Sequence, residues 1–282
     1  MDEIISSYQF SQKQRVELQR FLYKELIRLS ILIDETLTEP QIYGLISALV
    51  KKARYAVNGE TDQERIDQLL AFFYQEQGFN CDFEEYFFVD NLLLNKVLRK
   101  LRGMPVSLGA IVLHLASLLD LPLYPVNFPT QLVLRADMTM ENGRKHTRYI
   151  NPWDGSYLSY ELMTKWLEAE MGYEAELNRE VLRIANFPEL LERLETVFKM
   201  ALTREGRYEE TLRLIEYRLA LDPQDPYEIR DRGMVLASMD CYQAAYDDLS
   251  YFIDQCPDDP SAMMLKLEMS SLENQIKTSV FH

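Results

Sequence analysis

The sequence is poor in the residue types from which metal sites and disulfide frameworks are built. Its 282 residues include only three cysteines and three histidines. Cys81, Cys241 and Cys256 lie far apart and form no CxxC pair, so their spacing indicates neither a disulfide framework nor a zinc site. No spacing of His, Cys and Asp brings several metal ligands together. We therefore expect no metal and no cofactor.

Positive charge is also scarce, and long hydrophobic runs are absent. The 30 Lys and Arg residues face 45 Asp and Glu residues, giving a net charge of -15 without a local basic patch. Such a surface repels a phosphate backbone, so we expect no nucleic-acid partner. No run approaches the roughly 18 apolar residues that span a bilayer, and residues 1–10 lack the pattern of a signal peptide. We expect a cytoplasmic protein without a membrane partner.

Hydrophobic residues are plentiful, and their spacing predicts helices over the first hundred residues. They make up 47% of the chain, enough for a sizeable core, and the length corresponds to about two domains. In residues 1–102 the apolar positions recur at intervals of three and four, as on one face of a helix. The clearest series is Val16, Leu18, Phe21, Leu22, Leu26 and Leu29.

Two helix starts are well marked in this N-terminal region. Thr38 and Thr61 are each followed, three residues later, by Gln or Glu. This spacing is typical of a capping box, in which the two side chains bond each other's backbone amides. It predicts helices near 39–57 and 62–77. Gly78 is placed to end the second helix in a left-handed conformation.

The middle of the sequence predicts one buried helix followed by a small antiparallel sheet. A helix near 90–101 is expected to stop at Gly103, and residues 105–119 are apolar nearly all round, which is typical of a helix inside a domain. Shorter runs of β-type residues come next. The expected strands are 123–128, 131–138 and 146–150, with an Asn142–Gly143 turn before the last and an amphipathic helix from Ser159 through Trp166.

The last hundred residues repeat at an interval of 34 residues, which is the length of the helix-turn-helix unit of tetratricopeptide repeats. The second copy adds Gly233 and Ala245 where two helices must approach closely. About two copies are visible. The matching pairs are Tyr208 with Tyr242, Ile215 with Leu249, Leu219 with Ile253, Pro223 with Pro257, and Pro226 with Pro260.

Three motifs in the middle of the chain have the layout of an amide-chemistry site. They are GMPVSL (103–108), FPTQLVLR (128–135) and YINPWDG (149–155). Such a site needs a thiolate at a helix N-terminus, an imidazole base on a neighbouring strand and a carboxylate that orients the base. With the repeats that follow, these motifs resemble the SirB-type family of bacterial transglutaminase-like, tetratricopeptide-repeat proteins, from about residue 35 onward.

The resemblance implies an α+β, mainly α fold in three parts. These are an N-terminal helical region (1–102), a degenerate transglutaminase-like, papain-like core with a small antiparallel sheet (103–185), and a tetratricopeptide domain (186–282). Ser107 stands where active relatives place Cys, Gln131 where they place His, and Asn151 where they place Asp.

These replacements predict a protein without catalytic activity. Gln131 cannot accept a proton at neutral pH, so Ser107 has no base to activate it, and Asn151 could not stabilise an imidazolium. Two alternatives stay open for the three residues: a neutral hydrogen-bond cluster, or a pocket that binds an amide or peptide without turning it over. A residual hydrolase or acyl transferase would have to use Ser107 or Cys81 as its nucleophile.

None of the three histidines is placed to act as a substitute base. His114 lies seven residues beyond Ser107 on the same predicted helix, about 10 Å along its axis, and we expect a core histidine with a satisfied ring nitrogen. His146 follows the predicted turn and should be solvated. His282 is the last residue of the sequence.

The repeats offer a second candidate site, because helical repeats present a concave surface to peptides. Aligning the repeats places four candidate peptide-binding residues on the inner helix face: Arg193, Tyr227, Arg230 and Met234. The arginines could bind a carboxylate through paired hydrogen bonds. Alternatively, neighbouring acidic residues such as Glu228 and Asp231 neutralise them within the chain.

Together these patterns predict a non-catalytic protein-interaction factor that binds another protein or peptide. The family resemblance implies a regulatory role in bacteria. The alternatives are the residual enzyme and a structural subunit of a larger assembly, for which a large apolar patch would be expected.

Overall fold

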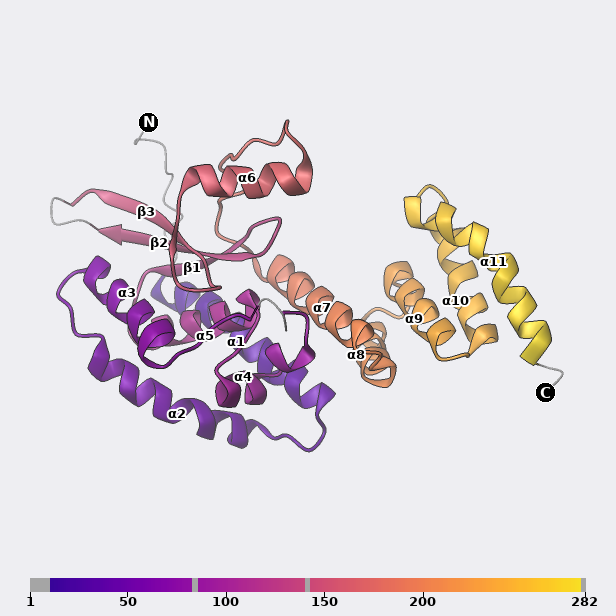
Figure 1. The fold of residues 1–282 in the computed structure, drawn as a ribbon, viewed down its shortest axis with the longest axis horizontal. Helices are drawn as coiled ribbons and strands as arrows, with labels where there is room; N and C mark the ends of the chain where they lie inside the picture. Colours follow the sequence, from indigo (N-terminus) through magenta and orange to yellow (C-terminus); the bar gives the residue numbers. More distant parts are fainter. Residues whose placement is uncertain (1–10, 83–85, 140–142, 280–282) are drawn as a thin grey trace. The chain divides into compact units, whose positions relative to one another are not determined.

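The computed structural model describes residues 11–82, 86–139 and 143–279, and Figure 1 shows its fold. Contacts divide the chain into two compact units: unit 1 extends to Phe198 and unit 2 begins at Lys199. The division falls within helix α7 (Phe187–Arg204). The described residues form helices and one small antiparallel sheet, which confirms the mainly helical α+β prediction.

Unit 1 is built around helix α5 (Pro105–Leu118), the apolar helix predicted from the sequence. Every residue of α5 except His114 and Leu118 is buried. Helices α1 (Gln12–Ile33), α2 (Glu39–Ala56) and α3 (Asp62–Leu70) all contact it, as do the first two strands. Helices before residue 103 and strands after it therefore share one core. The predicted boundary between residues 102 and 103 lies within this core.

The sheet is a meander of four antiparallel strands in the order β1-β2-β3-β4. The strands are β1 (Leu123–Asn127), β2 (Leu132–Thr139), β3 (Lys145–Ile150) and β4 (Tyr157–Leu158). It lies against α5 so closely that a Cβ on Gly109 would come within 2.7 Å of the Leu132 side chain. Of the predicted turn, Asn142 lies outside the described residues, and Gly143 has the left-handed φ of 76° that a glycine permits.

The predicted helix starts are present. The Thr61 hydroxyl accepts a hydrogen bond from the amide of Glu64 (3.2 Å), and the Glu64 carboxylate accepts one from the amide of Thr61 (3.2 Å). The amide of Thr38 likewise donates to the Gln41 side chain (2.9 Å). Helix α6 (Tyr160–Met171) begins after Ser159, as predicted.

Two helices differ in detail from the prediction. The helix expected over 62–77 is α3 followed by a π-helical segment, η1 (Ala71–Glu76), before Gly78 adopts its expected left-handed conformation. A short 3-10 turn, η2 (Val89–Asn91), precedes helix α4 (Leu94–Lys100).

Helix α4 ends at Lys100, and Leu101, whose φ is 58°, terminates it in place of the expected Gly103. The backbone of Asn80 explains this early stop. Its amide donates to the Leu101 carbonyl oxygen (3.0 Å), and its own carbonyl oxygen accepts from the Gly103 amide (3.1 Å). These two bonds draw the chain away from the helix before Gly103 is reached.

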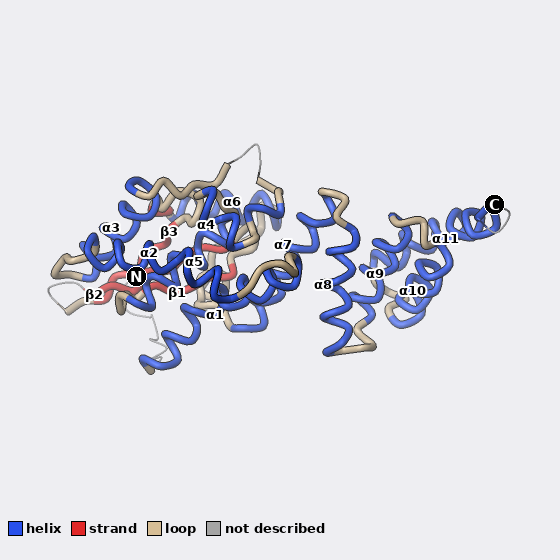
Figure 2. Tube along the Cα trace, turned by 90° about the horizontal axis from the view of Figure 1, so that it is seen from below, coloured by secondary structure: helices blue, strands red, loops and turns tan. Residues whose placement is uncertain are grey.

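Unit 2 consists only of helices in the residues that the structure describes (Figure 2). After the end of α7 come α8 (Tyr208–Leu221), α9 (Pro226–Ser238), α10 (Tyr242–Gln255) and α11 (Pro260–Ser279), and each of α8, α9 and α10 packs on the next. The 34-residue register holds, because equivalent helices begin at Tyr208 and Tyr242 and at Pro226 and Pro260. Helix α11 thus begins a third copy, beyond the two expected. No helix in the described ranges has the length and apolarity to cross a membrane.

Candidate functional site

Ser107 lies in the first turn of α5, at the helix N-terminus where the nucleophile position was expected. Its side chain is fully buried. The hydroxyl donates to the carbonyl oxygen of Asn91 at 2.6 Å and lies 3.0 Å from that of Met104, which is a second acceptor for the same hydrogen. The hydroxyl is therefore directed at backbone oxygens, and these satisfy the buried group.

Gln131 and Asn151 are brought together by the sheet. Gln131 immediately precedes β2 and Asn151 immediately follows β3, and these strands pair with Leu134 opposite Ile150. The Gln131 side-chain nitrogen donates to the Asn151 side-chain oxygen over 3.0 Å. The same oxygen accepts from the Trp153 amide at 3.1 Å. The two side chains thus form a hydrogen-bonded pair of neutral amides next to paired strands.

Cys81, the other proposed nucleophile, is a buried thiol. Burial raises the pKa of Cys81 to about 12, and the nearby charge of Asp82 adds to the increase. Asp82 itself pairs with Arg102, whose guanidinium lies 3.2 Å from its carboxylate. A thiol with so high a pKa is protonated at neutral pH and is a weak nucleophile.

The described histidines are not placed near Ser107 as bases. His114 stacks on Tyr23 of α1, with ring centroids 4.0 Å apart, and burial together with the charge of Arg20 lowers the pKa of His114 to about 4. Its Nδ1 has no hydrogen-bond partner among the described residues, so the expectation of a satisfied core histidine was wrong at this atom. His146 is exposed on β3, as predicted, and His282 lies outside the described residues.

No group of three His, Cys, Asp or Glu residues in the described ranges is arranged to hold a metal ion.

Arg193 was predicted to face a peptide groove, but its guanidinium forms hydrogen bonds within unit 1. The guanidinium donates to the Asn127 side chain and to the carbonyl oxygens of Phe128 and Pro129, the last at 3.3 Å. These acceptors lie at the end of β1 and in the connection to β2. Arg193 therefore holds the segment that leads to Gln131.

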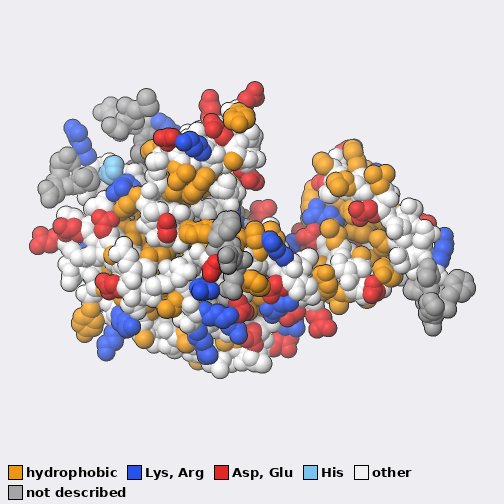
Figure 3. Space-filling model, in the orientation of Figure 1, with side chains coloured by type: hydrophobic (Ala, Val, Ile, Leu, Met, Phe, Trp, Pro, Cys, Tyr) orange, Lys and Arg blue, Asp and Glu red, His pale blue; other side chains and the backbone are white. Residues whose placement is uncertain are grey.

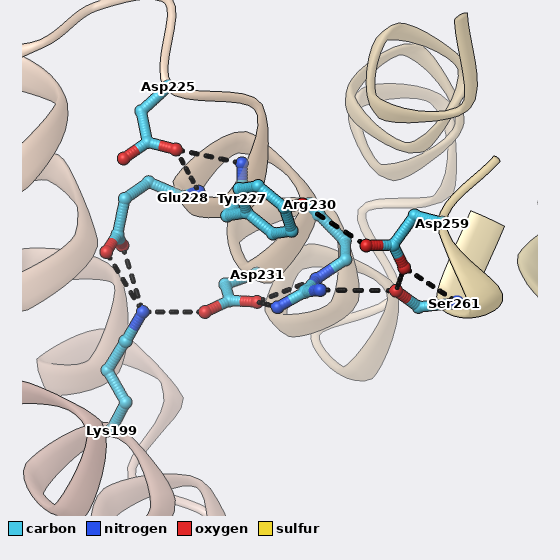
Figure 4. Close-up of polar contacts among 8 residues, drawn as sticks. All are labelled: Lys199, Asp225, Tyr227, Glu228, Arg230, Asp231, Asp259 and Ser261. Carbon is cyan, nitrogen blue, oxygen red and sulfur yellow. Dashed lines mark hydrogen bonds and ion pairs between the residues drawn. The ribbon is translucent and has the colours of Figure 1, made fainter. Parts of the chain in front are cut away.

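Arg230 of α9 belongs to a polar network in unit 2, shown in Figure 4. Its guanidinium donates twice to Asp231 (3.0 and 2.7 Å) and once to the Ser261 hydroxyl (3.3 Å). The other oxygen of Asp231 accepts from the Lys199 ammonium at 2.6 Å, and this ammonium also contacts both oxygens of Glu228 (3.0 and 3.1 Å). Arg230 is thus neutralised within the chain, the alternative left open by the sequence.

Tyr227 and Met234 keep much of their surface. Tyr227 is 48% exposed, although its hydroxyl donates to Asp259 (3.2 Å). Met234 is 51% exposed and lies two turns further along α9. Between them, the Arg230 guanidinium stacks at 5.3 Å from the Tyr227 ring and 5.2 Å from that of Phe252. We call Tyr227, Arg230 and Met234 the inner face; its accessible parts are an aromatic ring and a thioether, and its arginine is held in place.

Comparison with known proteins agrees with this architecture. A model of the transglutaminase-like superfamily matches residues 41–196, and a tetratricopeptide-repeat model matches residues 198–269. A UPF0162 protein of Pasteurella multocida is 49% identical over 234 residues, 83% of this chain and 87% of that protein. Protein SirB1 of Salmonella typhimurium is 40% identical over 83% of this chain and 86% of its own length. The chain belongs to the SirB1-type family.

The similarity to SirB1-type proteins extends over nearly the whole chain. A UPF0162 protein of Haemophilus influenzae is 40% identical over 93% of this chain and 97% of its own length. No solved structure matches the chain. Membership confirms the resemblance seen in the three motifs and the repeats, and it establishes the fold; the chemistry has to be argued from the site.

Sequence reasoning missed two features of this SirB1-type chain. The first is Lys199, which bridges Glu228 and Asp231; no motif marks it, and only its burial beside two carboxylates reveals its role. The second is a set of exposed residues on α11, Met263, Lys266 and Leu267. The 34-residue register, carried forward once more from α9, would have found these three.

Proposed function

We propose that the protein is a non-catalytic protein-interaction factor in which unit 2 binds a partner and unit 1 keeps the transglutaminase-like scaffold. The observation that carries this proposal is the pairing of Gln131 with Asn151 as two neutral amides; separately, the Ser107 hydroxyl donates to a backbone oxygen. A regulatory role follows from family resemblance alone.

The chemistry of the three positions supports binding over turnover. Acyl transfer needs a base that takes the proton of the nucleophile, and an amide does not take up a proton at neutral pH. Ser107 is also buried and already hydrogen-bonded, so attack would require breaking its bond to Asn91. The alternative nucleophile, Cys81, stays protonated because its pKa is raised.

The inner face of α9 supports binding through unit 2. Tyrosine and methionine are adaptable contact residues: the ring supplies a large amphipathic surface, and the thioether fits irregular partners. Tyr227 and Met234 are half exposed, whereas the charges between them are paired. We therefore expect the contact to depend on apolar burial more than on capture of a carboxylate by Arg230.

Recovery of partners by the tagged full chain from its native host tests the proposal. Met234→Glu should lower recovery of the specific partner about tenfold, because a carboxylate replaces an apolar contact. Leu221→Glu is the matched control, since Leu221 is the last residue of α8 and 66% exposed. Equal recovery by wild type and Met234→Glu would contradict the inner-face assignment.

A further inference from the structure

Helix α11 exposes the side that its equivalent in the preceding repeat buries. In α9, Ile229 is only 7% exposed and Gly233 faces α10, where a Cβ would come within 2.9 Å of Leu249. The residues 34 positions later are Met263, which is 58% exposed, and Leu267, which is 82% exposed. The water-facing side of a helix is normally polar. Two large apolar residues here contradict that rule.

The exposed side of α11 is distinct from the side by which it packs in unit 2. Ala262 and Leu265 are buried in a cluster with Leu249 and Phe252 of α10. At about 100° per residue, Met263 and Leu267 point to roughly the opposite side of the helix. In the view of Figure 3, hydrophobic and acidic side chains both reach the surface of unit 2. We call Met263, Lys266 and Leu267 the end face.

A basic residue at equivalent positions of α9 and α11 indicates which chemistry a partner of the end face would have. In α9, Arg232 lies beside Gly233 and donates two hydrogen bonds to Asp248 of α10 (2.7 and 2.8 Å). Its equivalent in α11 is Lys266, which is exposed and forms no ion pair within the described ranges. A helix packed on α11 in the register of α10 on α9, but further from the α11 axis because Leu267 replaces Gly233, would therefore place a carboxylate opposite Lys266.

From this register we infer that the end face binds an amphipathic helix of another protein, one with an apolar stripe and a single acidic residue beside it. The partner helix should carry one acidic residue opposite Lys266 and not be acidic throughout, because residues 199–282 carry sixteen Asp and Glu against nine Lys and Arg. A generally acidic segment would be repelled. The end face is on α11 and the inner face on α9, so this inference shares with the proposed function only the premise that unit 2 binds partners.

Helix α10 itself supplies the sequence of a probe. A fluorescent peptide spanning Tyr242–Gln255 with Leu249→Ala, which makes room for Leu267, carries the apolar stripe and Asp248 in the required order. A side-chain staple between positions 243 and 247, both exposed in the chain, would hold it helical. Its anisotropy, titrated with the full-length protein, should show saturable binding. The absence of saturable binding would overturn the inference.

Variants of the chain locate the binding. Leu267→Ser and Lys266→Glu should each weaken binding about tenfold, since one removes apolar burial and the other places like charges together. Met264→Ser, also in an exposed residue of α11, and Met234→Glu on the inner face should leave it unchanged. A peptide with Asp248→Lys should regain binding to the Lys266→Glu protein.

Two other outcomes would overturn the inference. Equal affinity for wild type and Leu267→Ser would mean that the peptide binds elsewhere, for example by displacing α10. A wild-type dimer in sedimentation that becomes monomeric with Leu267→Ser would mean that a second copy of this chain occupies the end face. Neither result bears on partner recovery through Met234, so the inference and the proposed function can fail independently.

Discussion

The side-chain nitrogen of Gln131 donates a hydrogen bond to the side-chain oxygen of Asn151, 3.0 Å away. Paired strands β2 and β3 hold the two residues, so the contact belongs to the sheet and not to a mobile loop. If the positions keep the geometry of a base and its acid, ionisable residues placed there should interact.

The double variant Gln131→His, Asn151→Asp tests this geometry. A carboxylate that accepts a hydrogen bond from an imidazole favours the charged ring, so the histidine at position 131 should titrate above its ordinary value of about 6.5. NMR titration of the imidazole ring protons measures it. The single variant Gln131→His, which keeps the neutral amide, is the control and should titrate lower. Equal pKa values in the two variants would show that the pair lacks this geometry.

Cys81 should react slowly with alkylating reagents. Its pKa is raised to about 12, so at pH 8 almost none of it is thiolate. Cys241 is exposed and serves as an internal control on the same chain. After treatment with iodoacetamide, peptide mass spectrometry should show Cys241 modified at least about tenfold faster than Cys81. Faster modification of Cys81 would revive it as a nucleophile.

Protonation of His114 should destabilise unit 1 as the pH falls. Burial lowers the pKa of His114 to about 4 in the folded chain, against about 6.5 when unfolded, so the unfolded state binds more protons between these values. Stability from this residue is complete above pH 6.5 and falls progressively toward pH 4. Between pH 7.5 and pH 5 the free energy of unfolding should fall by about 2 kcal/mol on its account.

Denaturation followed by tryptophan fluorescence measures this effect, because both tryptophans, Trp153 and Trp166, lie in unit 1. His114→Phe can keep the stacking on Tyr23 and should remove that part of the pH dependence. His146→Gln, at an exposed histidine, should keep it. An unchanged pH dependence in His114→Phe would show that His114 is not the group that titrates.

Arg193→Ala should destabilise unit 1. The guanidinium satisfies Asn127 and the carbonyl oxygens of Phe128 and Pro129, which would lose a charged donor. A loss of about 2–3 kcal/mol in the free energy of unfolding is expected. Arg179→Ala, at an exposed arginine of the same unit, should change it by less than about 0.5 kcal/mol. Equal effects would indicate that Arg193 contributes no more than a surface charge.

Local patterns in the sequence were sufficient to predict much of the fold. The apolar residues of 105–119 predicted α5, the spacing after Thr61 predicted its cap, and the pairs at 34 residues predicted the helical repeats of unit 2. Each feature depends on residues close in the sequence or on a repeated interval. The strands on either side of Gln131 and Asn151 were predictable for the same reason.

Contacts between distant residues were not predictable. Leu101 ends α4 in a left-handed conformation because backbone bonds to Asn80 require it, and a leucine gives no sign of this. Arg193 was assigned to the repeat groove from its register alone, yet its acceptors lie about sixty-five positions earlier in the chain. The missing partner of His114 Nδ1 likewise depends on how α1 packs on α5.

We propose that the protein acts by binding and not by catalysis. Transcript profiles of four strains of the native host test it most directly: wild type, a deletion, the double substitution Ser107→Ala, Cys81→Ala, and Met234→Glu, with protein levels matched by immunoblot. We expect the double-substitution strain to match wild type and the Met234→Glu strain to match the deletion. A double-substitution strain that matches the deletion, beside a normal Met234→Glu strain, would contradict it.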